Sequence, residues 1–424
     1  MKKFVALLLA LTLCIGLCAC GAQPEAPAAT DAPAAEAPAE ETPAATSETE
    51  ATTGSKDIKV GFIFLHDENS TYDLNFINAA KAACDEVGLS DDQVMMKTNI
   101  SESQACYDAA AELVDAGCNL IITDSFGHES FALAAAKEFP EVHFVSCTGV
   151  KAHTEGLSNF HNAFASIYEG RYLAGVAAGL KLNEMIENGD ITAEEAKMGY
   201  VGAFPYAEVK SGYTSFFLGA RSVCPSVTME VTFTSSWYDE ALEKEAANKL
   251  INNGCVLISQ HADSMGAPTA CETAGVPNVS YNGSTVAACP NTFIVSSRID
   301  WTPFFVYAIN CVASGEDIGY DWTGTLATGS VVLTDVNEQA AAAGTAEKIA
   351  EVMKALEDGS VKVFDTATFT VNGETVTTYL ADVDDLGDYV GETEAISDGV
   401  FLESYYRSAP YFDLDIDGIT NLDA

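Results

Sequence analysis

The chain has 424 residues, of which 62 are acidic and 20 are basic, so its formal net charge is −42 at neutral pH. Such an acidic excess repels phosphate backbones, which argues against nucleic acid as a partner and disfavours a polyanionic ligand. About 370 residues follow the N-terminal region described below, which is long for a single core, so two domains are expected.

The N-terminus has the layout of a secretory signal. Lys2 and Lys3 precede an apolar run over 4–17 that is too short to span a bilayer comfortably. The run ends in Leu-Cys-Ala-Cys, which resembles a bacterial lipobox, so residues 1–20 are the predicted lipoprotein signal peptide and Cys20 is the predicted lipidation site. The alternative is an ordinary cleaved signal and a free protein. No later segment has an apolar run of membrane-spanning length.

Residues 21–56 are built almost entirely from Ala, Pro, Thr, Glu and Ser. They include no aromatic residue and no Leu, Ile or Val, so they cannot bury enough apolar surface to offset the entropy of ordering. We predict a disordered tether, which with a lipid on Cys20 would anchor the folded body to the extracytoplasmic face of the cell membrane.

Nine cysteines follow Cys20, and none forms a Cys-x-x-Cys pair. Most have apolar neighbours, which favours small buried core residues over reactive thiols. An exported protein can pair some of its cysteines, but an odd number leaves at least one unpaired unless it bonds outside the chain.

From Ile58 onward, short apolar runs alternate with longer helical stretches. Strands are predicted at 58–65, 94–98, 119–123 and 142–146, with helices at 74–87, 102–116 and 129–138. After a long helix over 166–186 the pattern restarts, with strands at 198–203, 227–233, 256–259 and 279–281, and helices at 208–223, 240–252 and 267–274. Two more helices are predicted at 303–313 and 338–356. Asn372-Gly373 then predicts a tight hairpin turn between strands at 368–371 and 376–379.

Apolar strands separated by helices imply parallel sheets covered on both faces. The sequence therefore predicts an α/β protein with two similar lobes, each a mostly parallel sheet flanked by helices. The N-terminal lobe is placed at 57–165 plus a returning segment at 296–325. The C-terminal lobe is placed at 166–295 plus 326–424. Open parallel sheets bind ligands at the carboxyl ends of their strands, so a cleft between the lobes is the expected site.

Aromatic, amide and carboxylate side chains recur directly after the predicted strands of both lobes. Examples are Tyr72 after the first strand, Ser125-Phe126 after the third, and Trp237-Tyr238 and His261-Ala262-Asp263 in the second half. Aromatic walls with a few hydrogen-bonding groups suit a flat heterocycle or a sugar.

Several of these segments resemble the basic membrane protein family of substrate-binding lipoproteins. The resemblance runs from about residue 59 to about residue 301, and its most specific parts are Tyr-Glu-Gly-Arg-Tyr-Leu-Ala-Gly at 168–175 and Ser-Gln-His-Ala-Asp-Ser at 259–264. It implies the type I periplasmic-binding fold and a partner permease of the ABC type. It also implies a purine nucleoside or nucleobase as ligand, and the chain is most similar to a branch that favours bases such as adenine.

The same motifs imply site residues. Phe126 and Trp237 would stack on the ligand ring, Asp263 and Asn282 would hydrogen-bond to its nitrogens or amino groups, and Tyr72 would form a wall from the first lobe. The run Asn-Ser-Thr-Tyr-Asp-Leu-Asn at 69–75 departs from the Asp-x-Ser-Phe-Asn run of the nucleoside-binding branch, which puts recognition of a ribose by this loop in doubt.

Two features of the long helix over 166–186 stay open. Tyr168, Glu169 and Arg171 either lie at the mouth or hinge of the cleft, or Glu169 and Arg171 form an internal structural pair. Gly175-x-x-x-Gly179 imitates a membrane dimer motif, but close packing on a neighbouring helix is the expected role in this chain.

Other chemistry finds little support. The six histidines lack metal-ligand spacing, and the Asp-x-Asp-x-Asp-Gly run at 413–418 lacks the closing glutamate of a calcium loop, so no cofactor is expected. No nucleophile elbow, zinc-protease motif or phosphate-binding loop is present, so we do not expect an enzyme.

The sequence thus predicts a monomeric binding lipoprotein that delivers an adenine-like purine base or nucleoside to an ABC importer. The alternatives are another small ligand, such as riboflavin or a sugar, or a role as a ligand-sensing accessory to a membrane receptor.

Overall fold

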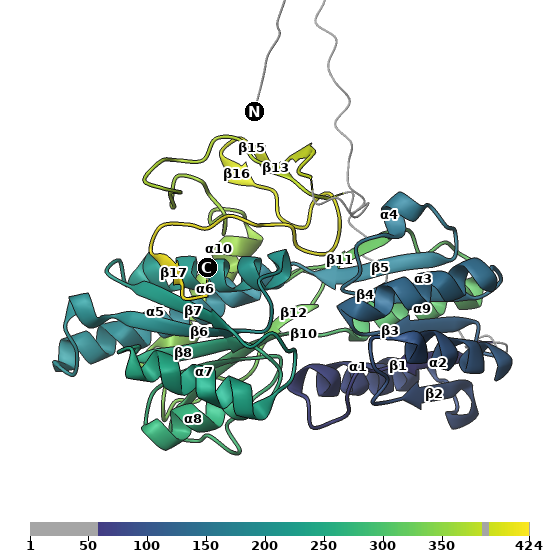
Figure 1. The fold of residues 1–424 in the computed structure, drawn as a ribbon, viewed down its shortest axis with the longest axis horizontal. Coiled ribbons are helices and arrows are strands. Elements are labelled where there is room, and N and C mark those ends of the chain that lie inside the picture. The colour runs from purple at the N-terminus through teal and green to yellow at the C-terminus, as the bar shows by residue number, and fades with distance from the viewer. Residues whose placement is uncertain (1–57, 384–389, 424) are drawn as a thin grey trace, which may run out of the picture. The chain divides into compact units, whose positions relative to one another are not determined.

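The computed structural model describes residues 58–383 and 390–423, which belong to one compact unit. The predicted signal peptide, Cys20 and the tether lie outside the described residues. Two separate sheets, each with helices on both faces, make up the unit (Figure 1). None of the described helices is both long and apolar enough to cross a membrane.

The first lobe is built on a six-stranded sheet in the order β11-β5-β4-β3-β1-β2, in which every pairing is parallel. Its strands are β1 (Val60–Ile63), β2 (Val94–Lys97), β3 (Leu120–Thr123), β4 (His143–Cys147), β5 (Phe160–Ala165) and β11 (Asp321–Gly324). Its helices are α1 (Thr71–Val87), α2 (Gln104–Asp115), α3 (Glu129–Glu138), α4 (Ala152–Glu155) and α9 (Thr302–Ser314), with short 3-10 turns at Asp91–Gln93 and Phe126–His128.

The second lobe has a seven-stranded sheet in the order β12-β10-β9-β8-β6-β7-β17, in which only β12 is antiparallel to its neighbour. Its strands are β6 (Lys197–Gly202), β7 (Thr228–Phe233), β8 (Leu257–His261), β9 (Asn278–Tyr281), β10 (Phe293–Ile299), β12 (Val331–Leu333) and β17 (Ile419–Asn421). Its helices are α5 (Ile167–Asn188), α6 (Ala207–Val223), α7 (Glu240–Asn252), α8 (Gly266–Ala274) and α10 (Thr345–Glu357), with a 3-10 turn at Ala193–Glu195.

Strands β2-β1-β3-β4-β5 of the first sheet and β7-β6-β8-β9-β10 of the second follow the same spatial order. This is the doubly wound order 2-1-3-4-5, in which the crevice for a ligand opens where the direction of winding reverses. The predicted α/β fold with two similar, mostly parallel lobes is therefore confirmed, and the reversal points lie between β1 and β3 and between β6 and β8.

Within the described residues the chain crosses between the lobes three times, after β5, after β10 and after β11. The backbone amide of Ser166 donates to the carbonyl of Gly324 at 2.7 Å, and that of Asp300 donates to Ser330 at 2.7 Å, so the crossings are tied to each other. Because β10 belongs to the second sheet up to Ile299, the segment that returns to the first lobe begins at residue 300 rather than at the predicted 296.

Helices α5 and α6 cross at very short range because each presents glycines to the other. A Cβ added to Gly175 would lie 2.0 Å from the carbonyl oxygen of Phe216, and one added to Gly219 would lie 2.0 Å from that of Tyr172. The Gly175-x-x-x-Gly179 motif thus serves helix packing inside the second lobe, as predicted.

The structure contradicts both expectations for Arg171. Its side chain is fully buried in the second lobe, where it donates to Ser259 Oγ at 2.7 Å and to Tyr200 Oη at 3.2 Å. It is therefore neither at a mouth nor paired with Glu169, whose carboxylate accepts from the amide of Leu326 at 3.3 Å. The sequence pattern suggested an ion pair between helical neighbours, but the two side chains face different surroundings.

The nine cysteines after Cys20 all fall in the described part of the chain. Each is buried and carries a free thiol, which confirms their role as small core residues.

Residues 358–383 and 390–423, here called the C-terminal segment, cover part of the second lobe with little regular structure. They contribute two small antiparallel pairs, β13 (Leu380–Ala381) with β14 (Thr393–Glu394) and β15 (Ile396–Ser397) with β16 (Val400–Phe401), before β17 joins the second sheet. The segment belongs to the core of that lobe, because Phe364 stacks on Phe412 at 4.5 Å between ring centroids.

The hairpin predicted around Asn372-Gly373 is wrong in its strands. Both turn residues have the positive φ values that the tight turn requires, 53° and 80°. Only a single bridge between Val371 and Glu374 follows, however, and 376–379 does not pair as a strand. The Asn-Gly pair specifies the turn locally. A strand also needs a neighbouring strand with which to pair, and the local sequence does not determine that.

Candidate ligand-binding site

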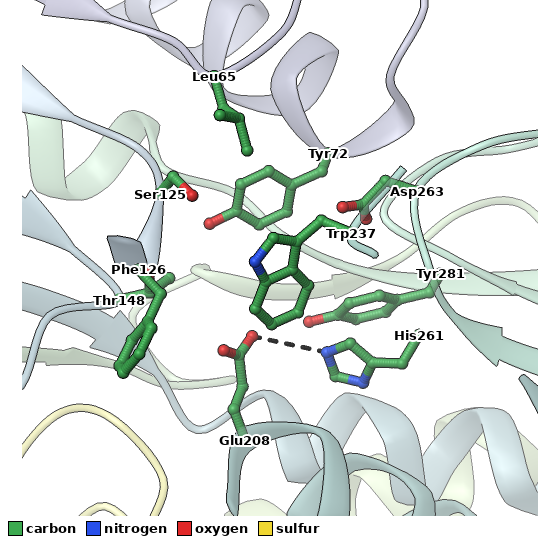
Figure 2. A pocket seen from close by; sticks show the side chains of 10 residues that line it. All are labelled: Leu65, Tyr72, Ser125, Phe126, Thr148, Glu208, Trp237, His261, Asp263 and Tyr281. Carbon is green, nitrogen blue, oxygen red and sulfur yellow. Dashed lines mark ion pairs between the residues drawn. The ribbon is translucent and has the colours of Figure 1, made fainter. Parts of the chain in front are cut away.

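A cavity lies between the two lobes, at the carboxyl ends of their strands, and the space between its lining atoms, open solvent included, is about 360 Å³. Side chains from both lobes converge on it (Figure 2). Its lining residues are Leu65, Tyr72, Ser125, Phe126 and Thr148 from the first lobe and Glu208, Trp237, His261, Asp263 and Tyr281 from the second. They lie at or after the carboxyl ends of strands of both sheets, including the strands beside both reversal points, which is where an open parallel sheet binds its ligand.

Tyr72 presents its ring to this cavity because the loop before it is fixed. Ser70 caps helix α1, accepting from the amide of Asp73 at 3.1 Å and donating to its carboxylate at 2.6 Å. The other oxygen of Asp73 accepts from the amide of His66 at 2.7 Å. The hydroxyl of Tyr72 donates to the carbonyl of Asp124 at 2.6 Å. Since that hydroxyl has a protein partner, the ring face is what Tyr72 offers to a ligand.

Trp237 and Asp263 are linked through their backbones. The amide of Asp263 donates to the carbonyl of Trp237 at 3.0 Å, which joins the loops after β7 and β8. The carbonyl of Asp263 in turn accepts from both the amide and the hydroxyl of Thr71 in the first lobe, each at 3.1 Å. The lobes therefore touch directly beside the cavity.

Asp263 is a buried carboxyl group directed at the aromatic walls (Figure 2). Burial raises its pKa well above the ordinary aspartate value, and the neighbouring carboxylates of Asp73, Glu243 and Glu208 add to the rise. Asn282 donates to its Oδ1 at 3.2 Å and holds it in place. A carboxyl group that protonates this easily can offer a donor and an acceptor side by side.

The floor of the cavity on the second lobe combines His261, Glu208 and Tyr281. His261 Nε2 lies 3.5 Å from Glu208 Oε1, and the rings of His261 and Tyr281 are 4.4 Å apart. Burial lowers the pKa of His261, so the imidazole is neutral near pH 7. The guanidinium of Arg171, buried in the second lobe, lies over the Tyr281 ring at 5.3 Å from its centroid.

Four of the five predicted ligand-binding residues line the cavity, namely Tyr72, Phe126, Trp237 and Asp263. The fifth, Asn282, touches Asp263 from behind, so its position suits orienting the carboxyl group. Their contacts with a ligand stay predictions. Glu208 was not predicted, because it lies in the first turn of α6 rather than directly after a strand.

Residues 63–363 match the family model of ABC transporter substrate-binding proteins of the PnrA-like type, Bmp. The chain belongs to this family. The matched range includes every residue that lines the cavity, and it confirms the resemblance found in the sequence.

Two curated proteins are similar to this chain. The chain is 30% identical over 268 residues to a purine-binding protein of Brucella abortus, an alignment that covers 62% of this chain and 71% of the relative. It is 31% identical over 235 residues to a putative ABC transporter glucose-binding protein of Haloferax volcanii, covering 55% of this chain and 56% of that one.

Solved structures confirm the fold. A solute-binding protein of an ABC transporter system from Conexibacter woesei superimposes with a TM-score of 0.58 at 20% identity, over 72% of this chain and 98% of the other. One from Aeropyrum pernix gives 0.59 at 17% identity, over 75% and 94%. Membership of the family, rather than these structures, makes the protein a solute-binding component of an ABC transporter, which binds a small molecule outside the cytoplasm and delivers it to a permease. The family consists of binding proteins rather than enzymes.

Proposed function

We propose that the solute is a purine, with the ring of adenine or a similar aminopurine held in the cavity between the lobes. Asp263 carries the proposal, as a buried carboxyl group in a cavity with aromatic walls. Its pKa, raised by burial, allows the group to keep a proton. A protonated carboxyl then presents an O–H donor beside an oxygen acceptor. An aminopurine edge, with an amino group next to a ring nitrogen, is the complement of that pair.

The walls suit a flat aromatic ring. Tyr72, Phe126, Trp237 and Tyr281 surround the cavity, and aromatic faces favour stacked or edge-on contact with another π-system. No lysine or arginine is among the residues that line this cavity, whereas Glu208 and Asp263 both are. A lining with an acidic and no basic side chain disfavours an anionic ligand and suits one with N–H donors. The similarity to a purine-binding protein of Brucella abortus supports the same assignment.

We further propose that Cys20 is lipidated after signal cleavage and that residues 21–56 tether the body to the membrane. The lipobox-like Leu-Cys-Ala-Cys run supports this, and mass spectrometry of the membrane-extracted protein would test it. A diacylated N-terminal Cys20 is expected, and a mature chain that starts elsewhere without lipid would contradict the anchor.

The ligand is tested by a thermal-shift screen of the full-length chain in mild detergent. Adenine, guanine, hypoxanthine, adenosine, riboflavin and glucose would be compared. A ligand at a hundred times its Kd adds about 2.7 kcal/mol to the free energy of unfolding, which gives a clear rise in Tm. We expect adenine to raise Tm more than hypoxanthine, which lacks the amino group. A rise with glucose or riboflavin alone would sink the purine assignment and leave the family intact.

A further inference from the structure

A buried chain of polar side chains leads from the interior of the second lobe to the cavity between the lobes. Arg171, from the Tyr-Glu-Gly-Arg motif, donates from Nη2 to Tyr200 Oη at 3.2 Å. Tyr200 Oη in turn lies 3.3 Å from Nδ1 of His261, which belongs to the Ser-Gln-His-Ala-Asp-Ser motif. All three residues are buried, and His261 lines the cavity. The two motifs that the sequence singled out are thus joined through Tyr200.

The chain determines which nitrogen of His261 carries the proton. Because Tyr200 Oη accepts from Arg171, its own O–H is left to donate to His261 Nδ1. Burial lowers the pKa of His261 more than Glu208 raises it, and the charge of Arg171 lowers it further, so the imidazole is neutral. A neutral imidazole that accepts at Nδ1 carries its proton on Nε2.

Helix α6 places Glu208 opposite that proton. His261 Nε2 lies 3.5 Å from Glu208 Oε1 (Figure 2). The imidazole can lie against α6 because residue 212 is glycine, where an added Cβ would lie 2.8 Å from His261 Nδ1. Residues four apart share one face of a helix, so Gly212 leaves room for the ring and Glu208 meets its Nε2–H. A separation of 3.5 Å is slightly longer than an ordinary N–H···O hydrogen bond and is closed by a small rotation of the Glu208 side chain.

The chain also joins two opposite charges. In the described part of the chain, the hydrogen-bond partners of Arg171 are all neutral: Tyr200, the hydroxyls of Ser259 and Ser297, and the carbonyl of Ser280. A buried charge is costly without a charge of the opposite sign. The carboxylate of Glu208 acts on His261 from the other end of the chain. Glu208 is therefore held in place from the interior of the lobe, although it lines the cavity.

Glu208 can be reached by a ligand. Its side chain is 15% exposed, and in Figure 2 its carboxylate lies across Trp237 from Asp263, with one oxygen toward His261 and the other turned away. A carboxylate only accepts hydrogen bonds, so a ligand must bring an N–H or O–H to it. A free purine base such as adenine has one N–H besides those of its amino group, and that N–H is on the five-membered ring.

We propose that Glu208 is a specificity-determining residue, which accepts the five-membered-ring N–H of a purine base while Asp263 pairs with the amino edge. Arg171, Tyr200 and His261 are then positioning residues that orient the Glu208 carboxylate. The proposal rests on the proposed function, which supplies the ring. A purine whose ring N–H is replaced by a methyl group should lose the contact with Glu208 and keep the contact with Asp263.

Isothermal titration of the full-length chain in mild detergent with adenine, 9-methyladenine and 7-methyladenine tests the proposal. Both methyl compounds keep the amino edge and lack the ring N–H. The wild type should bind adenine at least about tenfold more tightly than either, as the loss of one hydrogen bond to a charged group implies. In Glu208→Gln the amide carbonyl accepts from His261 Nε2–H, which leaves the amide N–H facing the ring N–H. Adenine should therefore weaken at least about tenfold and the methyl compounds much less. Comparing the ratios removes the effect of the methyl group's bulk.

Glu240→Gln is the matched control for this variant. Glu240 also lies in the first turn of a helix, α7, but it is exposed and does not line the cavity. The ratio of the affinities for adenine and the methyl compounds should keep its wild-type value.

Tyr200→Phe tests the positioning role. The variant loses the O–H that fixes the His261 tautomer, so the preference for adenine should fall roughly threefold or more. A merely structural loss would weaken all three compounds by the same factor and leave the ratio unchanged. Tyr213→Phe is its matched control, because Tyr213 is buried with its ring 5.7 Å from that of Tyr200 and does not line the cavity. It should keep the wild-type ratio.

The outcomes separate this proposal from the proposed function. Equal affinities of the wild type for the three compounds, or a wild-type ratio in Glu208→Gln, would overturn the role of Glu208 and leave the purine assignment standing. If none of the three binds, the proposed function fails and this proposal fails with it. Nitrogen-15 NMR of the histidine-labelled chain, with the signal assigned by His261→Gln, reads the tautomer without any ligand. We expect the proton on Nε2, and a proton on Nδ1 would overturn the positioning role.

Discussion

Thr148, Ser235 and Asn282 hold left-handed backbone conformations at the strand ends of the cleft, with φ of 67°, 58° and 66°. Such conformations cost about 1–3 kcal/mol for residues with a Cβ and persist only where the surroundings enforce them. Thr148 lines the cavity between the lobes, Ser235 begins the loop that carries Trp237, and Asn282 holds Asp263. The strain thus falls on residues that aim the lining side chains, which supports the assignment of this cleft as the binding site.

Trp237→Ala should weaken binding of the purine by at least about 1 kcal/mol, since the indole would be lost as a stacking partner. Isothermal titration with adenine measures the change. Tyr320→Ala is the control, because Tyr320 is exposed and does not line the cavity between the lobes. An unchanged affinity in a folded Trp237→Ala variant would remove this residue from the site.

Glu403→Gln should change how stability depends on pH. Glu403 is buried, and burial raises its pKa from 4.5 to about 8. The folded state therefore binds a proton more tightly than the unfolded state, so stability falls as pH rises from about 4.5 to about 8 and then levels off. A neutral amide avoids this loss, so Tm of the variant should exceed that of the wild type by a few degrees at pH 9 and by little at pH 5.

Differential scanning fluorimetry at pH 5, 7 and 9 measures the effect on Tm. Glu187→Gln, on the exposed end of α5, is the control and should follow the wild-type profile. Parallel profiles for the wild type and Glu403→Gln would mean that the carboxyl group is not kept neutral by burial.

At this scale the sequence indicated the site wherever a lining residue directly follows an apolar strand, as Phe126 and Asp263 do. It could not indicate Glu208, because that residue lies in the first turn of α6 rather than directly after a strand. Asn282 was singled out for the ligand, whereas its amide contacts Asp263. Asn282 and Asp263 both follow predicted strands, so the sequence pattern could not distinguish the side chain that lines the cavity from the one that lies behind it.

At the scale of elements, most of the long helices and the apolar strands up to β9 were predictable to within a few residues, but β10 was missed although it begins with Phe-Ile-Val. The fully buried strand β5 was missed because its sequence, Phe-His-Asn-Ala-Phe-Ala, contains two polar residues. Both are satisfied by distant partners: Asn162 accepts from the amide of Ala152 at 2.7 Å, and His161 lies 3.0 Å from His143. Helix α10 begins at Thr345 rather than 338, because Gly344 holds a φ of 80° directly before it.

The contact between α5 and α6 supplies a prediction for an element. Gly219→Ala should lower the free energy of unfolding by about 1–3 kcal/mol or more, because the new methyl group meets a backbone carbonyl and forces the helices apart. Urea denaturation measures the loss. Gly283→Ala is the control, since its methyl group would find its nearest neighbour, Thr71 Cβ, at 3.7 Å. Equal denaturation midpoints for the two variants would show that the helices can separate without cost.

At the scale of the whole molecule, the C-terminal segment joins the two lobes as well as completing one of them. Its aromatic side chains are buried in the second lobe. It also reaches the first lobe, where Ser408 donates from its amide and its hydroxyl to Asp321 at 3.0 and 2.7 Å. His153 of α4 lies 2.8 Å from the carbonyl of Val383 and 3.3 Å from Asp321. Opening of the cleft must therefore break these contacts or move the contacting residues together. The sequence pattern could not reveal the contacts, because they join residues more than 80 positions apart.

Asp321→Ala should speed release of the bound ligand roughly fivefold to tenfold, since it removes the acceptor that ties Ser408 and His153 together, a loss of about 1 kcal/mol or more. Stopped-flow tryptophan fluorescence measures the dissociation rate.

The contact with Asp321 raises the pKa of His153, so the charged pair is fully formed below the ordinary histidine pKa of 6.5 and is lost as pH rises through the raised value. Release from the wild type should accordingly become faster toward alkaline pH, whereas release from Asp321→Ala should not. Asp317→Ala is the matched control, because Asp317 lies just before β11 and its carboxylate accepts from the nearby amide of Gly319 at 3.1 Å. If both variants released ligand at the same rate, the segment would not hold the lobes together.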